Sequence, residues 1–317
     1  MHRRELLPPI FLVGLPRTGS TLVSRMLSAH PDLVVFGEMH FLTPWRRDFR
    51  YFLRRIGNLG SDGAIRDLVD GIFLNPPPIG LRRGPYFWKQ IRRQEAAGLK
   101  AALLARLLDS KQRSIGTIFR VLIEEATVCR GGRRAVVKFP VFPAYIKELR
   151  EWWPDSKIIH LTRDPRAIAA SKSNDPGGTA RLVARYPWLE RPLRFSGRYF
   201  AVLQYCLASR VHARFRGSAD YWLLQYESLV SNNESVIRDL CRFCGLRDDQ
   251  AMLQPREGQA SSITGLKSSG FDVSRVDAWR KILTPLDAAV IERVARTSMA
   301  RFGYEPADRI AGNEFTA

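Results

Sequence analysis

The sequence has few cysteines and few histidines. Four cysteines in 317 residues are too few for a disulfide framework. Cys241 and Cys244 form a lone C-x-x-C in a helical pattern, and without a second pair or a nearby histidine they do not predict a zinc site. We interpret both as half-buried helix positions and expect a protein of the reducing cytoplasm.

Long apolar runs and internal repeats are also lacking. No stretch reaches the 18 or more apolar residues of a membrane span, so none is predicted. The first apolar run, residues 6–15, contains Pro8, Pro9 and Gly14, which favours a buried strand over a signal peptide. Chain length permits one large domain or two ordinary ones, and we expect a single domain over residues 1–317.

Acidic residues are scarce relative to basic ones. The chain has 31 Asp and Glu against 50 Lys and Arg, a net charge of +19. Basic residues dominate two blocks, 81–100 and 181–216, each with a single acid. A solvated surface and an anionic ligand or acceptor explain these blocks equally well. The charge also suits nucleic-acid binding, but no groove-reading element is recognisable and no nucleic-acid partner is expected.

Buried strands alternate with helices along much of the chain. Strands are predicted at residues 10–13, 33–36, 135–139, 157–161 and 221–225. Helices are predicted at 21–30, at 234–243 and from Asp164 onward, where Asp164 is the N-cap and Pro165 the first helical residue. This order predicts an α/β fold with a parallel sheet covered by helices on both faces. The predicted core is 8–42 and 134–304, with a mostly helical insertion over about 43–133 and a basic cap or lid over about 175–197.

The segment Gly14 to Thr21 joins the first strand to the first helix. Backbone N–H groups and the helix dipole at such a junction bind anions, and Arg17, Thr18, Ser20 and Thr21 add further donors. The two glycines have the spacing of a nucleotide P-loop, but serine occupies the position of its lysine. The loop therefore predicts phosphate or sulfate binding, whereas a Walker A assignment fails.

Several segments together resemble the sulfotransferases that use 3′-phosphoadenosine 5′-phosphosulfate. Residues 16–22, 29–32 and 37–38 are similar to the 5′-phosphosulfate loop of the carbohydrate, tyrosylprotein and bacterial branches. Residues 158–165, followed by Ser171, are similar to the family's 3′-phosphate motif. The resemblance implies a P-loop-type nucleotide-binding fold and a sulfuryl donor. No metal is expected, because a sulfuryl group carries less charge than a terminal phosphate and the sequence shows no clear Mg²⁺-binding carboxylate after a buried strand.

The resemblance also implies roles for individual residues. Arg17, Thr18, Gly19, Ser20 and Thr21 would bind the 5′-phosphosulfate, and Arg17 would also act in catalysis. Arg163 and Ser171 would bind the 3′-phosphate; the alternative for Arg163 is a structural pairing with Asp155 or Glu227. Lys138 resembles the family's catalytic lysine, with a solvated lysine at a strand end as the alternative. Tyr226 either contacts adenine or packs the core.

The general base is expected to be Glu38, which follows a predicted strand and Gly37. The resemblance points to a glutamate at about this distance from the loop arginine, but His40 lies two positions later and stays an alternative. A surface carboxylate, or a partner of Arg17, is the third interpretation of Glu38. The phenol branch has its histidine base two residues after the catalytic lysine, where this chain has Pro140.

The expected reaction is in-line transfer of a sulfuryl group to an acceptor with a free hydroxyl, with a carbohydrate or another polyhydroxylated or anionic acceptor favoured. A P-loop kinase or NTPase is the first alternative, but it needs a substitute for the missing lysine and a carboxylate for Mg²⁺. A basic nucleic-acid-binding protein is the second. The acceptor's identity and the oligomeric state do not follow from the sequence.

Overall fold

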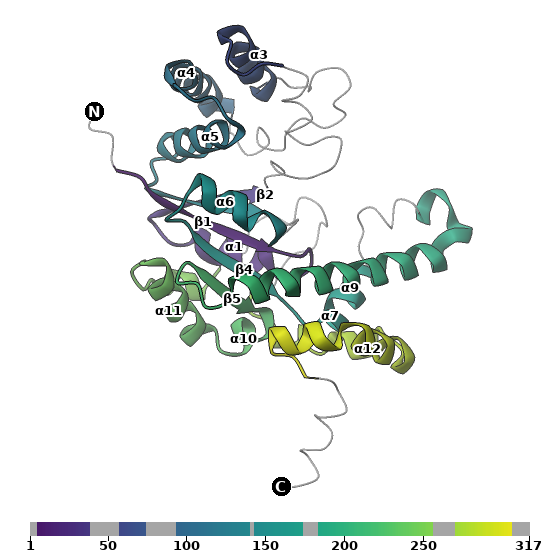
Figure 1. The fold of residues 1–317 in the computed structure, drawn as a ribbon. Coiled ribbons are helices and arrows are strands. Elements are labelled where there is room, and N and C mark those ends of the chain that lie inside the picture. Colours follow the sequence, from purple (N-terminus) through teal and green to yellow (C-terminus); the bar gives the residue numbers. More distant parts are fainter. Residues whose placement is uncertain are drawn as a thin grey trace. The chain divides into compact units, whose positions relative to one another are not determined.

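A computed structural model describes residues 5–38, 57–73, 93–139, 143–173, 183–255 and 270–305. Within these ranges a parallel sheet of five strands has the order β2-β3-β1-β4-β5. Figure 1 labels β1, β2, β4 and β5 of this sheet. The strands are β1 (Leu7–Gly14), β2 (Leu33–Glu38), β3 (Arg134–Phe139), β4 (Lys157–Thr162) and β5 (Tyr221–Gln225). The predicted α/β fold on a parallel sheet is confirmed.

Helices separate the strands along the chain. They are α1 (Ser20–Ser28), α3 (Asp62–Phe73), α4 (Arg93–Asp109), α5 (Ile115–Cys129), α6 (Ile146–Trp152), α7 (Pro165–Ser173), α9 (Glu190–Phe215), α10 (Tyr226–Ser231), α11 (Asn233–Cys244) and α12 (Pro285–Phe302). Short 3₁₀ helices are η2 (Pro143–Tyr145), η3 (Pro187–Leu189), η4 (Gln250–Leu253), η5 (Val273–Arg275) and η6 (Ala278–Lys281). No helix in the described ranges has both the length and the apolar composition to cross a bilayer.

The continuous apolar run of β1 matches its position inside the sheet. Ile10, Phe11, Leu12 and Val13 are all buried, although successive side chains of a strand point to opposite faces. A strand buried on both faces requires such a run. The sequence pattern therefore predicted this central strand correctly.

The chain divides into two compact units. The first comprises Met1–Leu12, His30–Val141 and Tyr145–Ile158, and the second comprises Val13–Ala29, Phe142–Ala144 and Ile159–Ala317. In the first unit α3 packs against α4, and α4 against α5. The described residues of the predicted insertion are thus largely helical, while its status as an insertion into a single domain stays a prediction.

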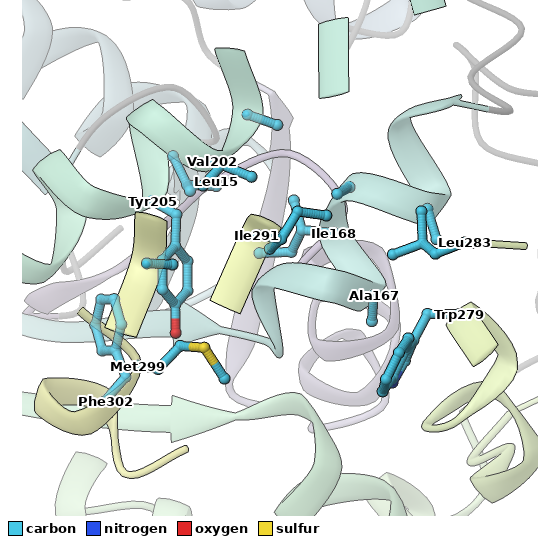
Figure 2. Close-up of a cluster of buried hydrophobic side chains, with 14 of the residues drawn as sticks. Leu15, Ala167, Ile168, Val202, Tyr205, Trp279, Leu283, Ile291, Met299 and Phe302 are labelled. Carbon is cyan, nitrogen blue, oxygen red and sulfur yellow. The ribbon is translucent and has the colours of Figure 1, made fainter. Parts of the chain in front are cut away.

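The second unit has a hydrophobic core between α7, α9 and α12 (Figure 2). Tyr205 of α9 and Phe302 of α12 pack ring against ring, with centroids 5.0 Å apart. Leu15 joins the same cluster from the end of the phosphate loop nearest β1. The loop is therefore anchored on this core.

Cys241 and Cys244 lie on α11 as predicted, but both are fully buried and not half-buried. The Sγ of Cys241 lies 3.8 Å from the Sδ of Met252 in η4. This apolar surrounding, together with Asp248, raises the pKa of the Cys241 thiol to about 11. The pair therefore packs the interior as two thiols.

The predicted basic lid overlaps a long helix that the sequence pattern did not reveal. Residues 190–197 form the start of α9, which continues to Phe215. Proline and glycine, here Pro192 and Gly197, are uncommon inside helices, but a proline in the first helical turn removes only an N–H that has no partner within the helix. The part of the predicted lid at 175–182 lies outside the described residues.

Candidate active site

The loop between β1 and α1 depends on two glycines. Gly14 has φ 152°, and a Cβ placed there would lie 2.5 Å from the carbonyl oxygen of Leu161. Gly19 has φ 87°, and a Cβ there would lie 2.5 Å from the Cδ2 of Tyr226. Both contacts are far too short for a side chain, so glycine is required by space as well as by backbone conformation.

Arg17 adopts a left-handed backbone conformation that costs about 1 kcal/mol for a residue with a Cβ. Its φ is 77°, and its Nε donates a hydrogen bond of 2.7 Å to the Oγ of Ser171 in α7. The structure thus brings together two residues that the sequence placed in separate phosphate motifs. Backbone strain of this kind concentrates at functional sites.

The start of α1 leaves donors for an anion. Gly19 is the N-cap residue, and it has no side chain to accept a hydrogen bond from the first N–H groups. The first turn, which begins with Ser20 and Thr21, contains no acidic residue. The positive end of the helix dipole is therefore not neutralised by the helix itself, as an oxyanion site requires.

Thr18 has a different role from its neighbours. It is almost completely buried, and its Oγ1 donates to the carbonyl oxygen of Leu15 at 2.7 Å. The hydroxyl hydrogen therefore holds the loop together. The prediction that Thr18 binds the cofactor rests on its backbone N–H.

Arg163, directly after β4, is packed against the same loop. Its Nη2 donates to the carbonyl oxygen of Arg275 at 2.6 Å, and its Nη1 lies 3.5 Å from that of Arg17. Its guanidinium carbon lies 4.3 Å from the ring centroid of Tyr226. The buried Nε has no hydrogen-bond partner among the described residues. A buried, unsatisfied donor on a partly buried cation suits a site that takes an anion.

Glu227, one of the two residues considered as an ion-pair partner of Arg163, binds other groups instead. The Glu227 carboxylate accepts hydrogen bonds from the Asp164 N–H, at 3.0 Å, and from the Tyr304 hydroxyl, at 2.7 Å. Burial raises the pKa of Glu227, although these hydrogen bonds oppose the shift. Glu227 thereby ties the end of β4 to the residues that follow α12.

Tyr226 is buried between Gly19 and Arg163. The aromatic ring lies against the loop at the point where no Cβ could fit, and one face packs against the guanidinium group. Tyr226 therefore supports the loop, in line with the packing interpretation. Contact with adenine stays a prediction.

A buried charge cluster at the start of α7 was not anticipated. Asp164 caps the helix as predicted, since its Oδ1 accepts from the N–H of Arg166 at 2.7 Å. The Arg166 guanidinium also pairs with Asp164 at 2.6 Å and Glu292 at 2.5 Å. Burial opposes this charge, but the two carboxylates outweigh it and raise the pKa of Arg166. The cluster fixes α7, which bears Ser171, against α12.

Glu38 and Lys138 lie side by side at the ends of β2 and β3 in the first unit. They are register partners in the parallel pair, after an irregularity that spans Phe36 to Glu38. Lys138 is buried, with 7% of its surface exposed, so the alternative of a solvated lysine is wrong. Glu38 belongs to β2 itself, and His40 lies outside the described residues.

Comparisons with known proteins all point to one protein family. A model of the "Sulfotransferase family" matches residues 8–250. The chain is 23% identical over 322 residues to omega-hydroxy-beta-dihydromenaquinone-9 sulfotransferase Stf3 of Mycobacterium tuberculosis, which covers 94% of this chain and 76% of that protein. Human carbohydrate sulfotransferase 2 is 27% identical over 215 residues, or 56% of this chain and 41% of that protein.

Solved structures agree on the fold. The sulfotransferase domain from the curacin biosynthetic pathway superposes with a TM-score of 0.58 at 21% identity, over 95% of this chain and 99% of that chain. The chain spans a smaller share of some longer relatives. It covers 31% of an uncharacterised Aquifex aeolicus protein, to which it is 23% identical over 290 residues.

Proposed function

Because the chain belongs to the sulfotransferase family, we propose that it transfers a sulfuryl group from 3′-phosphoadenosine 5′-phosphosulfate to an acceptor hydroxyl. The hydrogen bond between Arg17 and Ser171 is the observation that supports this donor best. The 5′-phosphosulfate and the 3′-phosphate belong to one nucleotide, so their binding groups must lie close together. The bond between Arg17 and Ser171 joins the motif proposed for the 5′-phosphosulfate to the motif proposed for the 3′-phosphate.

The residues of the second unit suit such a nucleotide. The uncapped start of α1 and the loop N–H groups would hold the 5′-phosphate, and Arg17 would add a cation. Arg163 would bind the 3′-phosphate through its guanidinium group, whose buried Nε lacks a described partner. Packing of Gly19 on Tyr226 would keep the loop in the conformation that aims its N–H groups.

The reaction needs charge stabilisation and a base. Sulfuryl transfer forms a bond between sulfur and the acceptor oxygen and breaks the bond between sulfur and the bridging phosphate oxygen. Arg17 and Lys138 would stabilise the negative charge left on the departing phosphate. Glu38 would accept the proton of the acceptor hydroxyl, with His40 as the alternative.

The acceptor is proposed to be a carbohydrate or another polyhydroxylated or anionic molecule. The basic blocks at 81–100 and 181–216 suit an anionic acceptor. One relative is named for carbohydrate and another for a hydroxylated menaquinone, so a lipid hydroxyl is the second candidate. Incubation with labelled donor and separate carbohydrate and lipid extracts would decide between them by the product that gains a sulfate mass.

Thermal protection by nucleotides tests the donor directly. Adenosine 3′,5′-bisphosphate, the product left by the proposed donor, should raise the Tm, because a ligand that binds only the folded state stabilises it. Mg-ATP should give no comparable shift. Protection by Mg-ATP together with no effect of the bisphosphate would instead support a P-loop kinase or NTPase.

A further inference from the structure

The outer side of α9 is apolar where a surface helix is normally polar. Its inner side, which includes Val202 and Tyr205, is buried against α7 and α12. On the opposite side Phe200, Leu203 and Leu207 are 53%, 57% and 53% exposed. Their spacing of three and four residues places them on one face of the helix. An exposed apolar face of this kind marks an interaction site.

More apolar surface precedes this stripe. Trp188 in η3 is 74% exposed, and Phe195 in the second turn of α9 is 58% exposed. Phe195 packs against Tyr199, with ring centroids 4.4 Å apart. Aromatic side chains therefore extend the apolar surface from the stripe toward the N-terminal end of the helix.

All charged side chains in residues 191–215 are cationic. The segment has five arginines and no Asp or Glu. Two of the arginines pair within the protein, Arg194 with Glu190 and Arg198 with Asp287. Arg191, Arg210 and Arg214 are exposed. Arg210 and Arg214 follow Leu207 by three and seven residues, so they continue the apolar stripe on the same face.

We propose that this face of α9 docks on the surface of an anionic lipid bilayer. Aromatic and aliphatic side chains enter the boundary between head groups and acyl chains, while arginines bind anionic head groups. The helix lies in the plane of the membrane surface and does not cross it. Its inner side stays packed in the protein core, so the whole second unit is held at the membrane.

Charge distinguishes this partner from a second copy of the chain. A symmetric dimer through the face would place an arginine-bearing surface against itself, with no acidic residue of α9 beyond Glu190 to compensate. An uncharged bilayer would satisfy the apolar side chains but not the arginines. Only an anionic surface matches both properties of the face.

Flotation of the full chain with lipid vesicles tests the proposal. Vesicles of phosphatidylcholine alone are compared with an equal mixture of phosphatidylcholine and phosphatidylglycerol, at low and high salt. The chain should float with the anionic vesicles and far less with the neutral ones, and high salt should weaken binding. Equal binding to both, or binding to neither, would overturn the proposal.

Variants identify the face. The Arg210→Gln/Arg214→Gln variant should lower partitioning into anionic vesicles by about 30-fold, given the contribution of each arginine near such a surface. The Phe200→Gln/Leu203→Gln/Leu207→Gln variant should lower it by at least about 100-fold. Glutamine keeps helix propensity, and circular dichroism with the Tm checks folding.

Matched controls lie on α12. Arg293→Gln/Arg296→Gln and Leu286→Gln change exposed side chains of the same types, and they should float like the wild type. Equal loss in the controls would contradict a role for the α9 face. Sedimentation velocity tests the alternative of a dimer. If the wild type does not float but forms a dimer, and only the triple variant dissociates that dimer, the face binds a second copy of the chain.

Discussion

Lys138 combines burial with a position at the end of β3. A buried cation stabilises nearby negative charge more strongly than an exposed one, because little water screens it. We propose that it acts on the leaving phosphate in the transition state. Its effect should then appear in turnover and not in binding.

The Lys138→Met variant should lower kcat by about 100-fold or more, because a preorganised charge is removed while side-chain volume is kept. Affinity for adenosine 3′,5′-bisphosphate should change little. Steady-state kinetics and calorimetric binding give the two quantities, with Lys147→Met, an exposed lysine of α6, as control. A raised KM with unchanged kcat would reject the assignment.

Glu38 and its alternative His40 can be separated by paired variants. Glu38→Gln should lower kcat by about 100-fold to 10,000-fold, the usual effect of losing a general base, whereas His40→Ala should stay within about threefold. Turnover is measured from pH 5 to 9, with bisphosphate binding as the check on folding. Loss in His40→Ala alone would transfer the role to the histidine.

Arg163 is expected to bind the 3′-phosphate of the nucleotide. Arg163→Ala should weaken binding of adenosine 3′,5′-bisphosphate by about 10-fold to 100-fold, because charged hydrogen bonds are lost, and should hardly affect adenosine 5′-phosphosulfate, which lacks the 3′-phosphate. Isothermal titration with both nucleotides is the measurement, and Arg296→Ala is the control. Equal losses for the two nucleotides would show that Arg163 acts through the loop backbone and the Tyr226 ring instead.

At the scale of elements, the phosphate loop offers a matched pair of glycines. Gly19 and Gly217 both have φ 87°, but a Cβ at Gly217 would meet nothing within 4 Å, whereas at Gly19 it would strike Tyr226. Substitution by alanine therefore adds the same backbone strain at both positions and a steric clash at only one. The difference between the two variants isolates the packing of the loop on the ring.

Gly217→Ala should cost about 1 kcal/mol of unfolding free energy, the strain of a left-handed alanine. Gly19→Ala should cost about 1–3 kcal/mol more, as overpacking does in a core, and should also weaken bisphosphate binding. Urea unfolding and titration measure both effects. Indistinguishable variants would show that Tyr226 moves aside without consequence for the loop.

The elements of the sheet were predictable because their signals are local. Each of the five predicted strands falls on an observed strand, and Asp164 caps α7 as its position before Pro165 indicated. By contrast, the sequence did not predict the start of α9. Its proline and glycine argue against a helix, and the tertiary packing that makes the segment helical cannot be seen in a single sequence.

The site was predictable only in part, because some of its contacts join segments that are distant in the sequence. The residues of the phosphate loop and of the strand ends lie within recognisable sequence motifs. The residues that hold them in place lie far away in the sequence. Arg166 with Glu292 and Glu227 with Tyr304 are contacts between distant segments that no periodicity encodes. The burial of Lys138 likewise depends on the assembled fold, and a single sequence does not report it.

At the scale of the whole molecule, a buried histidine network links stability to pH. The Tyr221 hydroxyl lies 2.5 Å from the Nδ1 of His160 and 3.0 Å from the Nδ1 of His212. Burial, and secondarily His212, lower the pKa of His160 to about 3; burial and Arg216 lower the pKa of His212. In the unfolded chain each histidine takes up a proton near its ordinary pKa of about 6.5. The unfolded state therefore binds more protons at acid pH.

The free energy of unfolding should consequently fall as the pH drops from about 6.5 toward 3, by about 1.4 kcal/mol per pH unit for His160 alone. The His160→Gln variant lacks this titration, so its stability should decline less steeply by that amount. Urea unfolding at several pH values between 7 and 4 measures both slopes. Parallel slopes for the two proteins would contradict the linkage.

The contact between Arg17 and Ser171 also constrains biosynthesis. It joins residues 154 positions apart, and Arg163 depends on the Arg275 carbonyl 112 positions further on. At a synthesis rate of about 10 residues per second, the phosphate loop leaves the ribosome roughly 15 s before Ser171 does. The nascent loop must spend that interval without its native support, so nucleotide affinity is a property that the chain acquires late in translation, when the segments after β5 have emerged.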